Sequence, residues 1–517
     1  MGASDRPVDA GLLIVTTPTP EGSPPAGAPS AGASVEFSSS RGRWVVACAV
    51  LGSSMVLLDS TVVNVALPRI ADDFDVGLAP LQWTVTAYML TLSALILLGG
   101  SLGDRLGRRR VFVVGVIGFA AASLLCGLAP NVEVLVGARG LQGIGGALLT
   151  PGSLAMIQSS LRPGDRARAI GTWSGLGGVA AALGPFLGGW LADGPGWRWA
   201  FLINVPVAAV CVAVAVRHVP ETRDPHASKH FDIVGAVLGA VALAGATWAL
   251  IRAAEGGRAV EVAVVGVVAV AAGVAFVMVE RRQPEPMVPP TLFASRPFTV
   301  INVMTFAVYA AFGGYFFIVA LQLQVVAGYS AFWAGAALTP GTLLMLLFSA
   351  RSSALAARVG ARGPLTVGAL LCATGLLLML RIGPHAFYPT DVLPGAAVLG
   401  VGMVLLVAPL TSTVLAAVAD DHAGLASGVN NAVARAAGLL SVAAIPLITG
   451  TPADAGLGPA FDDTFDRAVP VFAGALVIAA VLAFVGLRPA SSAVGRPRRA
   501  GRATAATGNT ADPHLPG

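Results

Sequence analysis

The chain has 517 residues, of which 55% are hydrophobic and 11% are charged, and its formal net charge is +5. Soluble proteins average about 25% charged residues, so this composition excludes an ordinary soluble domain and indicates a protein that crosses a membrane many times. The positive charge does not indicate nucleic-acid binding, because the arginines lie in short connections between apolar runs and in a basic C-terminal tail.

Residues 1–42 are rich in proline, glycine, alanine and serine and lack the basic start and long apolar core of a signal peptide. We predict a disordered cytoplasmic tail there. Fourteen apolar runs long enough to cross a bilayer follow, and each predicts a helix, because helices satisfy their own backbone groups in lipid. The predicted spans are 44–66, 81–101, 110–129, 134–157, 168–191, 199–217, 233–253, 261–279, 298–322, 332–354, 364–381, 391–414, 424–448 and 468–487.

The lysines and arginines of the connections divide unequally, with sixteen on one side of the predicted membrane and six on the other. The positive-inside rule places the richer side in the cytoplasm, and an even number of spans leaves both termini there. The spans group as six, two and six, which predicts an all-α transporter of two similar halves around a central cavity. The predicted regions are the tail 1–42, a six-helix half 43–217, a linker 218–297 with two extra transmembrane helices, a second six-helix half 298–487 and a basic disordered cytoplasmic tail 488–517.

Asp59, in LLDSTVVNVALP, is the one acidic residue that we find well inside a predicted span. A carboxylate at that depth is costly as an anion, which favours proton exchange, and it could attract a cationic substrate. A structural ion pair or water near the outer rim would also explain it. Arg139, in ARGLQGIGG, lies at a similar depth by helix rise, so the two can pair. Arg139 could instead be an interhelical hydrogen-bond anchor, with Gln142 on the same helix face.

Arg435 lies near the middle of the thirteenth predicted span, in SGVNNAVARAAG, and that span contains no acid. It must face a cavity or a partner helix, because charge in hydrocarbon costs several kcal/mol. An anionic substrate and structural pairing are both open explanations. Tyr88, in the second span, could line the same cavity. The complete predicted substrate cavity consists of Asp59, Asn64, Tyr88, Gln142, Asn430 and Arg435.

The stretch GSLGDRLGRRRVF at 100–112 ends one apolar run and begins the next, with five charged residues between them. It predicts a short, stiff, cationic loop, because glycine allows a tight turn and the charges must stay in water. The candidate gating residues are Gly100, Asp104, Arg105, Gly107, Arg108 and Arg109.

The fifth predicted span contains several glycines and one internal proline. Small residues let helices approach closely, and proline bends a helix. This pattern predicts a kinked, close-packed helix suited to the contact between two moving halves. Ordinary glycine-based packing of membrane helices would give the same pattern. The residues concerned are Gly184, Pro185, Gly188 and Gly189.

The sequence contains no GxxxxGK[ST] nucleotide loop and no cluster with metal-ligand spacing. We therefore expect neither an enzyme nor a metal or cofactor site, and no driving force from ATP hydrolysis by this chain. The cysteines fall inside predicted spans with no spacing that indicates disulfides or metal; they are Cys48, Cys126, Cys211 and Cys372.

Five motifs, taken together and in this order, resemble those of the major facilitator superfamily, most closely its fourteen-helix drug:proton antiporter branch, the EmrB/QacA-like proteins. Two departures stand out. The motif around Gly184 usually has a glycine four residues earlier, where this chain has Ala180. The stretch ARSSALAARVGARG at 350–363 is a version of the motif at 100–110 that lacks the aspartate. The matching stretches are LDSTVVNVALP at 58–68, GSLGDRLGRRR at 100–110, RGLQG at 139–143, GPFLGG at 184–189 and WRWAFLINVP at 197–206.

This resemblance implies that Asp59 and Arg139 couple protons to substrate, and that Asp104 and the arginines after it latch the cytoplasmic face. We predict that Asp104 docks on the start of the thirteenth span in the outward-open state, so Asp104→Asn should weaken transport and leave insertion intact.

The expected function is proton-coupled efflux of hydrophobic drugs or antibiotics by alternating access, with cationic compounds as one option. Proton-coupled uptake or uniport of a small metabolite is the alternative. We expect a monomeric multi-pass protein of a bacterial cell membrane, with a small molecule, protons and lipid as partners and no nucleic acid. The bacterial source is suggested by the excess of arginine over lysine.

Overall fold

The computed structural model describes Gly2 and residues 35–224, 232–283, 286–418, 423–451, 457–458 and 461–487, with the backbone alone at 167, 423 and 424. Internal contacts divide the chain into two units, 1–34 and 35–517, and all the described helices belong to the second. The predicted tail 488–517 and nearly all of residues 1–34 lie outside the described residues.

Fourteen helices in the described residues are long and apolar enough to cross a membrane. Each coincides with one predicted span, so the number of spans is confirmed. The sixth span is interrupted at Ile203 and forms two helices. The first six spans are α1 (Ser40–Phe74), α2 (Leu78–Leu106), α3 (Arg108–Gly127), α4 (Val132–Ser160), α5 (Pro163–Asp193) and α6 (Trp199–Leu202) with α7 (Asn204–His218).

The other eight spans begin with the pair α8 (Ile233–Ala254) and α9 (Ala259–Arg282). A 3₁₀ turn, η1 (Pro290–Ala294), leads to the last six. Short 3₁₀ or π turns extend three of these spans, and one span is divided at Leu338. They are α10 (Arg296–Leu321) with η2 (Gln322–Val326), α11 (Ala331–Ala337) with α12 (Thr339–Val359), α13 (Arg362–Leu378) with η3 (Met379–Arg381), η4 (Tyr388–Val392) with α14 (Leu393–Ala416), α15 (Ala423–Thr449) and α16 (Phe461–Gly486).

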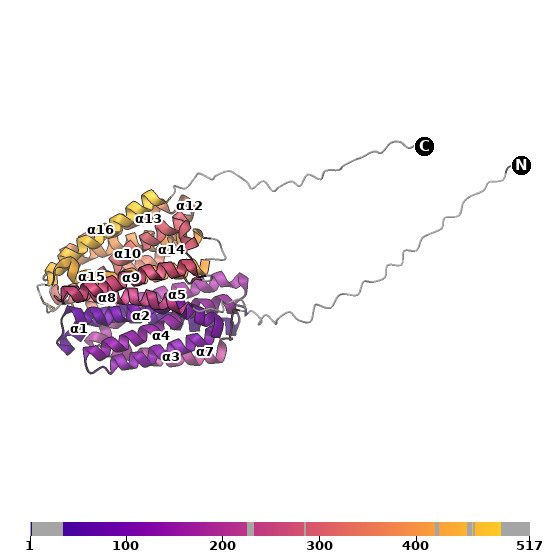
Figure 1. Ribbon diagram of the computed structural model, residues 1–517, viewed down its shortest axis with the longest axis horizontal. Helices are drawn as coiled ribbons and strands as arrows, with labels where there is room; N and C mark the ends of the chain where they lie inside the picture. Colours follow the sequence, from indigo (N-terminus) through magenta and orange to yellow (C-terminus); the bar gives the residue numbers. More distant parts are fainter. Residues whose placement is uncertain are drawn as a thin grey trace. The chain divides into compact units, whose positions relative to one another are not determined.

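Each half is built around closely packed helices (Figure 1). In the first half α4 packs against α1, α2 and α3, and in the second half α10 packs against α15 and α16. Glycines permit the closest approaches: a Cβ on Gly145 of α4 would lie 2.5 Å from the backbone nitrogen of Phe119 on α3. In lipid, such backbone proximity supplies the packing contacts that replace the hydrophobic effect.

The helices alternate in direction, so α1 and α5 end on the side where α2 begins. We call this side the Asp193 end, and the opposite side, where α2 meets α3, the Gly107 end. At the Asp193 end the carboxylate of Asp193 accepts a hydrogen bond from the backbone nitrogen of Phe332 on α11 (2.9 Å). Gln324 of η2 donates to the carbonyl of Val65 on α1 (3.0 Å). The two halves are therefore joined at this end.

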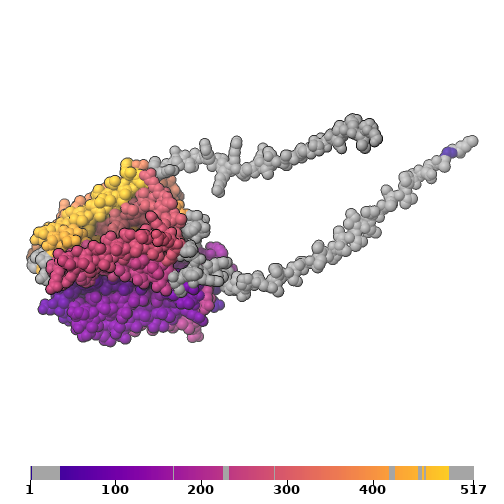
Figure 2. Space-filling model, viewed as in Figure 1, coloured from indigo at the N-terminus to yellow at the C-terminus, as the bar shows by residue number. Residues whose placement is uncertain are grey.

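One of the two extra helices, α8, contacts both halves. α8 packs against α2 of the first half and α15 of the second, and α9 packs against α8. Ile251 of α8 lies in one apolar cluster with Ala79 of α2 and Ala443 of α15. In Figure 2 the pair forms the surface between the indigo and yellow parts of the bundle. α8 thus covers the line along which the two halves meet.

The prediction of a cationic loop at 100–112 is wrong. α2 continues to Leu106 and α3 starts at Arg108, so the connection is Gly107 alone, with φ +117°. Gly100 and Asp104 are helical residues of α2. Charged residues end an apolar window but need not end a helix, which can continue into the membrane interface.

Several other boundaries also differ from prediction, among them the end of α1, which continues to Phe74 and not only to residue 66. The last span begins at Phe461 and not near 468, because acidic residues such as Asp462 and Asp463 favour a first helical turn. The N-terminal tail was predicted to reach residue 42, but the structure describes the chain from Val35, whose backbone nitrogen donates to the carbonyl of Ser160 (2.8 Å). Within the described ranges, the isolated bridge from Val35 to Leu161 is the only β-type pairing.

Candidate functional site

Asp59 and Arg139 form a direct ion pair inside the first half. Nη1 of Arg139 on α4 lies 2.6 Å from Oδ2 of Asp59 on α1, and both side chains are at most 1% exposed. Gln142, one turn along α4, donates to the other carboxylate oxygen of Asp59 (2.7 Å) and accepts from Arg139 (2.6 Å). The structure therefore contains the direct pair that the similar depths of the two residues allowed.

Three other helices complete the shell of this pair. Ser123 of α3 accepts a hydrogen bond from Gln142 (2.8 Å), and Asn204 of α7 contacts Asp59 (3.4 Å) and Ser123 (3.3 Å). The backbone carbonyl of Thr84 on α2 accepts from Nε of Arg139 (3.0 Å). These three residues were not predicted. Two features of the sequence could have pointed to Asn204, because it lies in the motif WRWAFLINVP and begins the apolar run NVPVAAVCVAVAV. We call Asp59, Ser123, Arg139, Gln142 and Asn204 the Asp59 cluster.

Tyr88 of α2 forms an aromatic wall of the Asp59 cluster. The guanidinium carbon of Arg139 lies 4.2 Å from its ring centroid, a cation–π distance, and Phe119 packs edge-on at 6.5 Å. Tyr88 is 1% exposed, and its hydroxyl has no hydrogen-bond partner among the described residues. It lies within electrostatic reach of Asp59, Arg139 and Arg435. Tyr88 therefore lies near both the Asp59 cluster and Arg435.

The buried charges of the Asp59 cluster balance one another. The carboxylate of Asp59 is balanced by one guanidinium and accepts bonds from two amides. Protonation would remove the negative charge that holds Arg139, and the buried arginine would then need another acceptor. Binding or release of one proton would thus change how α1 packs against α4.

The other predicted cavity residues lie apart from this cluster. Asn430 of α15 donates to Thr305 (2.8 Å) and Asn302 (3.2 Å) of α10, which ties two helices of the second half together. Arg435 of α15 donates through Nε to Asn431 one turn earlier (3.2 Å). Asn64 of α1 is half-buried, and its amide oxygen has no partner among the described residues. The structure therefore gathers Asp59, Tyr88 and Gln142 but not the remaining three.

At the Gly107 end, Asp104 and Arg108 face each other across the single-residue connection. Nη2 and Nε of Arg108 both reach Oδ1 of Asp104, at 2.7 and 2.8 Å. The predicted docking of Asp104 on the start of α15 concerns another conformation and stays a prediction. Arg105 lies in the last turn of α2 and Arg109 in the first turn of α3, so both lie at this end.

The segment 219–224, which follows α7, packs onto the Gly107 connection and was not predicted. The backbone nitrogen of Arg108 donates to the carbonyl of Thr222 (3.0 Å). In return, the backbone nitrogen of Asp224 donates to the carbonyl of Asp104 (2.9 Å). Glu221 accepts from the backbone nitrogen of Arg109 (3.1 Å). This segment thereby fixes the connection between α2 and α3.

Substituting alanine for Gly107 should lower the melting temperature and weaken the α2–α3 connection. The residue has φ +117°, and an added Cβ would lie 2.6 Å from Oε1 of Glu221. A strained backbone of this kind costs about 1–3 kcal/mol. Thermal unfolding in detergent checks this. The control is Gly137→Ala in α4, where nothing lies within 4 Å of the added Cβ; equal melting temperatures for the two variants would contradict the expectation.

The glycines of the α5 motif form a contact between three helices. A Cβ on Gly184 would clash with Thr61 of α1, and one on Gly188 would lie 2.8 Å from Cα of Val62. Gly189 faces Phe332 of α11, with no room for a Cβ. The motif therefore lets α5 pack against both α1 and α11, which belong to different halves.

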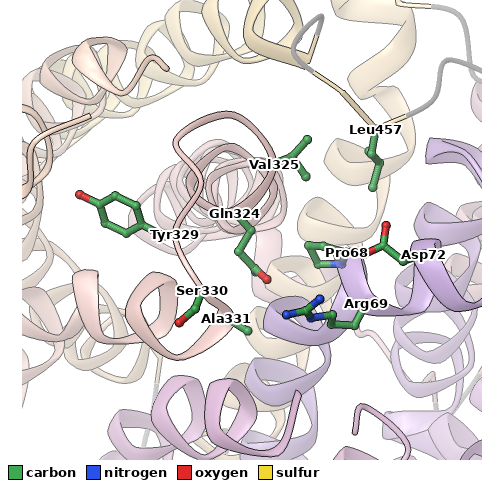
Figure 3. A pocket seen from close by; sticks show the side chains of 9 residues that line it. All are labelled: Pro68, Arg69, Asp72, Gln324, Val325, Tyr329, Ser330, Ala331 and Leu457. Atoms are coloured by element: carbon green, nitrogen blue, oxygen red, sulfur yellow. The ribbon is translucent and has the colours of Figure 1, made fainter. Parts of the chain in front are cut away.

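A cavity of about 230 Å³ lies at the Asp193 end (Figure 3). α1 forms one wall, and η2 with the start of α11 forms the other, so both halves contribute. No predicted substrate-cavity residue lines it, and Pro68 is about 14 Å further along α1 than Asp59 by helix rise. The lining residues are Pro68, Arg69, Asp72, Gln324, Val325, Tyr329, Ser330, Ala331 and Leu457.

Two helical halves that meet at one end, together with a sealed ion pair between membrane helices, define a polytopic membrane transporter. A family model described as Major Facilitator Superfamily matches residues 49–442. The chain belongs to this superfamily and is a transporter, not an enzyme.

Curated relatives match the chain over most of their own length. The puromycin resistance protein of Streptomyces alboniger is 36% identical over 468 residues, covering 86% of this chain and 91% of the relative. The tetracenomycin C resistance and export protein of Streptomyces glaucescens is 34% identical, with 85% and 81% covered. The methylenomycin A resistance protein of Bacillus subtilis is 34% identical, with 84% and 93% covered.

Solved structures share the fold at low identity. A peptide transporter bound to sulfate superposes with a TM-score of 0.64 at 15% identity, covering 87% of this chain and 96% of that one. A bacterial homologue of the lysosomal transporter Spinster gives a TM-score of 0.59 at 17% identity, with 87% and 97% covered. These likenesses support the helical architecture alone.

Proposed function

We propose that this chain exports small hydrophobic drugs or antibiotics across a bacterial cell membrane in exchange for protons. The observation that carries the proposal is the sealed pair of Asp59 and Arg139, because a carboxylate held this way can couple its protonation to helix packing. Curated relatives named for antibiotic resistance and export support the direction of transport. No cofactor is needed if the proton gradient supplies the driving force.

Alternating access would use the two joined halves. With the predicted orientation, the Asp193 end faces outside and the Gly107 end faces the cytoplasm, where both termini also lie. The hydrogen bonds of Asp193 and Gln324 then close the outer side. Opening there would break these bonds, and the Gly107 end would close instead. One chain contains both halves and the Asp59 cluster, which supports a monomer as the transporting unit.

The role of Asp59 in this cycle follows from its partners. Protonation from the outer side would neutralise the carboxylate and favour the return to the conformation closed outside. Release of the proton to the cytoplasm would restore the ion pair with Arg139 and accompany substrate binding.

A proton-flux measurement in inverted membrane vesicles tests the proposal. A pH gradient is imposed, and hydrophobic cations, anions and neutral antibiotics are added to vesicles with and without the chain. Export predicts that at least one compound dissipates the gradient only where the chain is present. Accumulation of a compound by intact cells with no proton movement would instead favour uniport or uptake of a metabolite.

A further inference from the structure

Arg435 is a positive charge near the middle of α15 with no carboxylate partner in the described part of the chain. Its Nε donates to Oδ1 of Asn431 on the same helix (3.2 Å). That bond leaves both terminal nitrogens, Nη1 and Nη2, without a protein acceptor among the described residues. A guanidinium keeps its charge in proteins, so an acceptor or water must meet it there.

The side chain of Arg435 faces the space between the halves. Its electrostatic neighbours are Tyr88 of α2 in the first half and Tyr309 of α10 in the second. Arg435 and Tyr309 are only partly buried and Asn431 is exposed, although α15 packs against both α2 and α10. Solvent therefore reaches Arg435 within the bundle, as expected for a residue that lines a substrate cavity.

Asp59 offers a contrast. Its charge is matched by Arg139, and both are sealed at 1% exposure behind Tyr88. Asp59 would attract a cationic compound only if its negative charge were not balanced, and in this conformation Arg139 balances it. The unmatched charge that a compound meets between α2, α10 and α15 is positive.

We propose that Arg435 is the anion-binding residue of the substrate cavity, and that the chain selects hydrophobic compounds with a carboxylate or phenolate over cationic ones. This rests on the export proposed above and specifies its substrate class. The hydrogen bond from Nε to Asn431 orients the guanidinium of Arg435. The two terminal nitrogens can then donate two parallel hydrogen bonds to a carboxylate. Tyr88, which lies near both Arg435 and the Asp59 cluster, carries a buried hydroxyl with no partner among the described residues.

Two xanthene dyes of opposite charge test the selection by fluorescence polarisation on the purified chain. Fluorescein carries a carboxylate and a phenolate, and rhodamine 6G is a cation with its carboxyl esterified. The chain should bind fluorescein more tightly. Arg435→Gln should weaken fluorescein binding roughly 10- to 100-fold, as expected for lost charge-assisted hydrogen bonds, and should not weaken rhodamine 6G. Arg435→Lys keeps the positive charge but cannot donate two parallel hydrogen bonds, so it should bind fluorescein with intermediate affinity.

Arg351→Gln is the matched control, because Arg351 is an exposed arginine that also donates to its own helix, at Leu347 (3.3 Å). It should leave both affinities unchanged. Tighter binding of rhodamine 6G by the natural chain, or unchanged fluorescein binding by Arg435→Gln, would overturn the proposal. If Arg435→Gln elutes as an aggregate, Arg435→Lys decides the outcome alone.

The binding assay and the proton-flux assay fail separately. Fluorescein binding without any proton flux would reject export and leave the anion site standing. Proton flux driven by cations alone would keep export and reject the anion site.

Discussion

Replacing Asp59 by asparagine should abolish proton-coupled transport and destabilise the bundle more than replacing Arg139 by glutamine. Either change breaks a pair whose members are at most 1% exposed. Removing one partner of a buried pair costs about 3–5 kcal/mol when the other stays charged. A carboxylate left alone can neutralise itself by taking a proton, but a guanidinium cannot. The asparagine variant therefore leaves the costlier group unpaired.

Thermal unfolding in detergent and substrate-driven proton flux measure the two effects. We expect melting temperatures to rise from Asp59→Asn to Arg139→Gln to the natural chain. The double variant should recover stability over Asp59→Asn without recovering flux. Asp463→Asn, an exposed acid at the Asp193 end, should change neither. Flux that survives in Asp59→Asn would move proton coupling to another residue, and a lower melting temperature for Arg139→Gln would refute the asymmetry.

The sequence predicts the fourteen spans and shows that Asp59 and Arg139 can pair, but it does not show that they do. A helix needs about 20 apolar residues to cross the bilayer. A charge inside a span is costly unless it is paired or faces a cavity. Asp59 and Arg139 therefore stand out, and helix rise alone shows that their depths agree.

Uncharged groups give no such signal. Ser123 and Asn204 complete the Asp59 cluster, yet a serine or an asparagine in an apolar span can hydrogen-bond to its own helix and need not mark a site. The carbonyl of Thr84, which accepts from Arg139, belongs to the backbone and leaves no trace in the sequence.

Contacts between distant segments are equally hidden. Glu221 reaches the backbone of Arg109 across 112 positions of the chain, and Gln82 donates to the carbonyl of Val442 across 360. The two extra helices read as plain apolar spans, and only the fold shows that α8 covers the meeting line of α2 and α15. We infer that α8 must slide or tilt when the halves separate there.

Substituting leucine for Gly189 should shift the chain away from the conformation joined at the Asp193 end and stop turnover. Any Cβ at Gly189 meets the backbone of Phe332, and a Cβ at Gly335 of α11 would meet the carbonyl of Pro185, so the two helices touch at matched glycines. Overpacking of a tight contact costs about 1–3 kcal/mol. Because that cost falls on one conformation only, the equilibrium should shift about 5- to 150-fold toward the other conformation.

Spin labels across this contact measure the shift. Trp190 of α5 and Trp333 of α11 are 59% and 65% exposed, so each can be replaced by a labelled cysteine. The four natural cysteines are buried and should not react. The natural chain should show a short distance between labels, and Gly189→Leu should show a longer one with loss of flux.

The matched control for Gly189→Leu is Gly175→Leu on the same helix, where nothing lies within 4 Å of an added Cβ. It should keep the short distance between the labels. If Gly189→Leu also keeps the short distance and transports normally, the glycine contact is not the element that the cycle opens and closes. The hydrogen bonds of Asp193 to α11 would then be the next candidate, because they join the same two helices one turn further on.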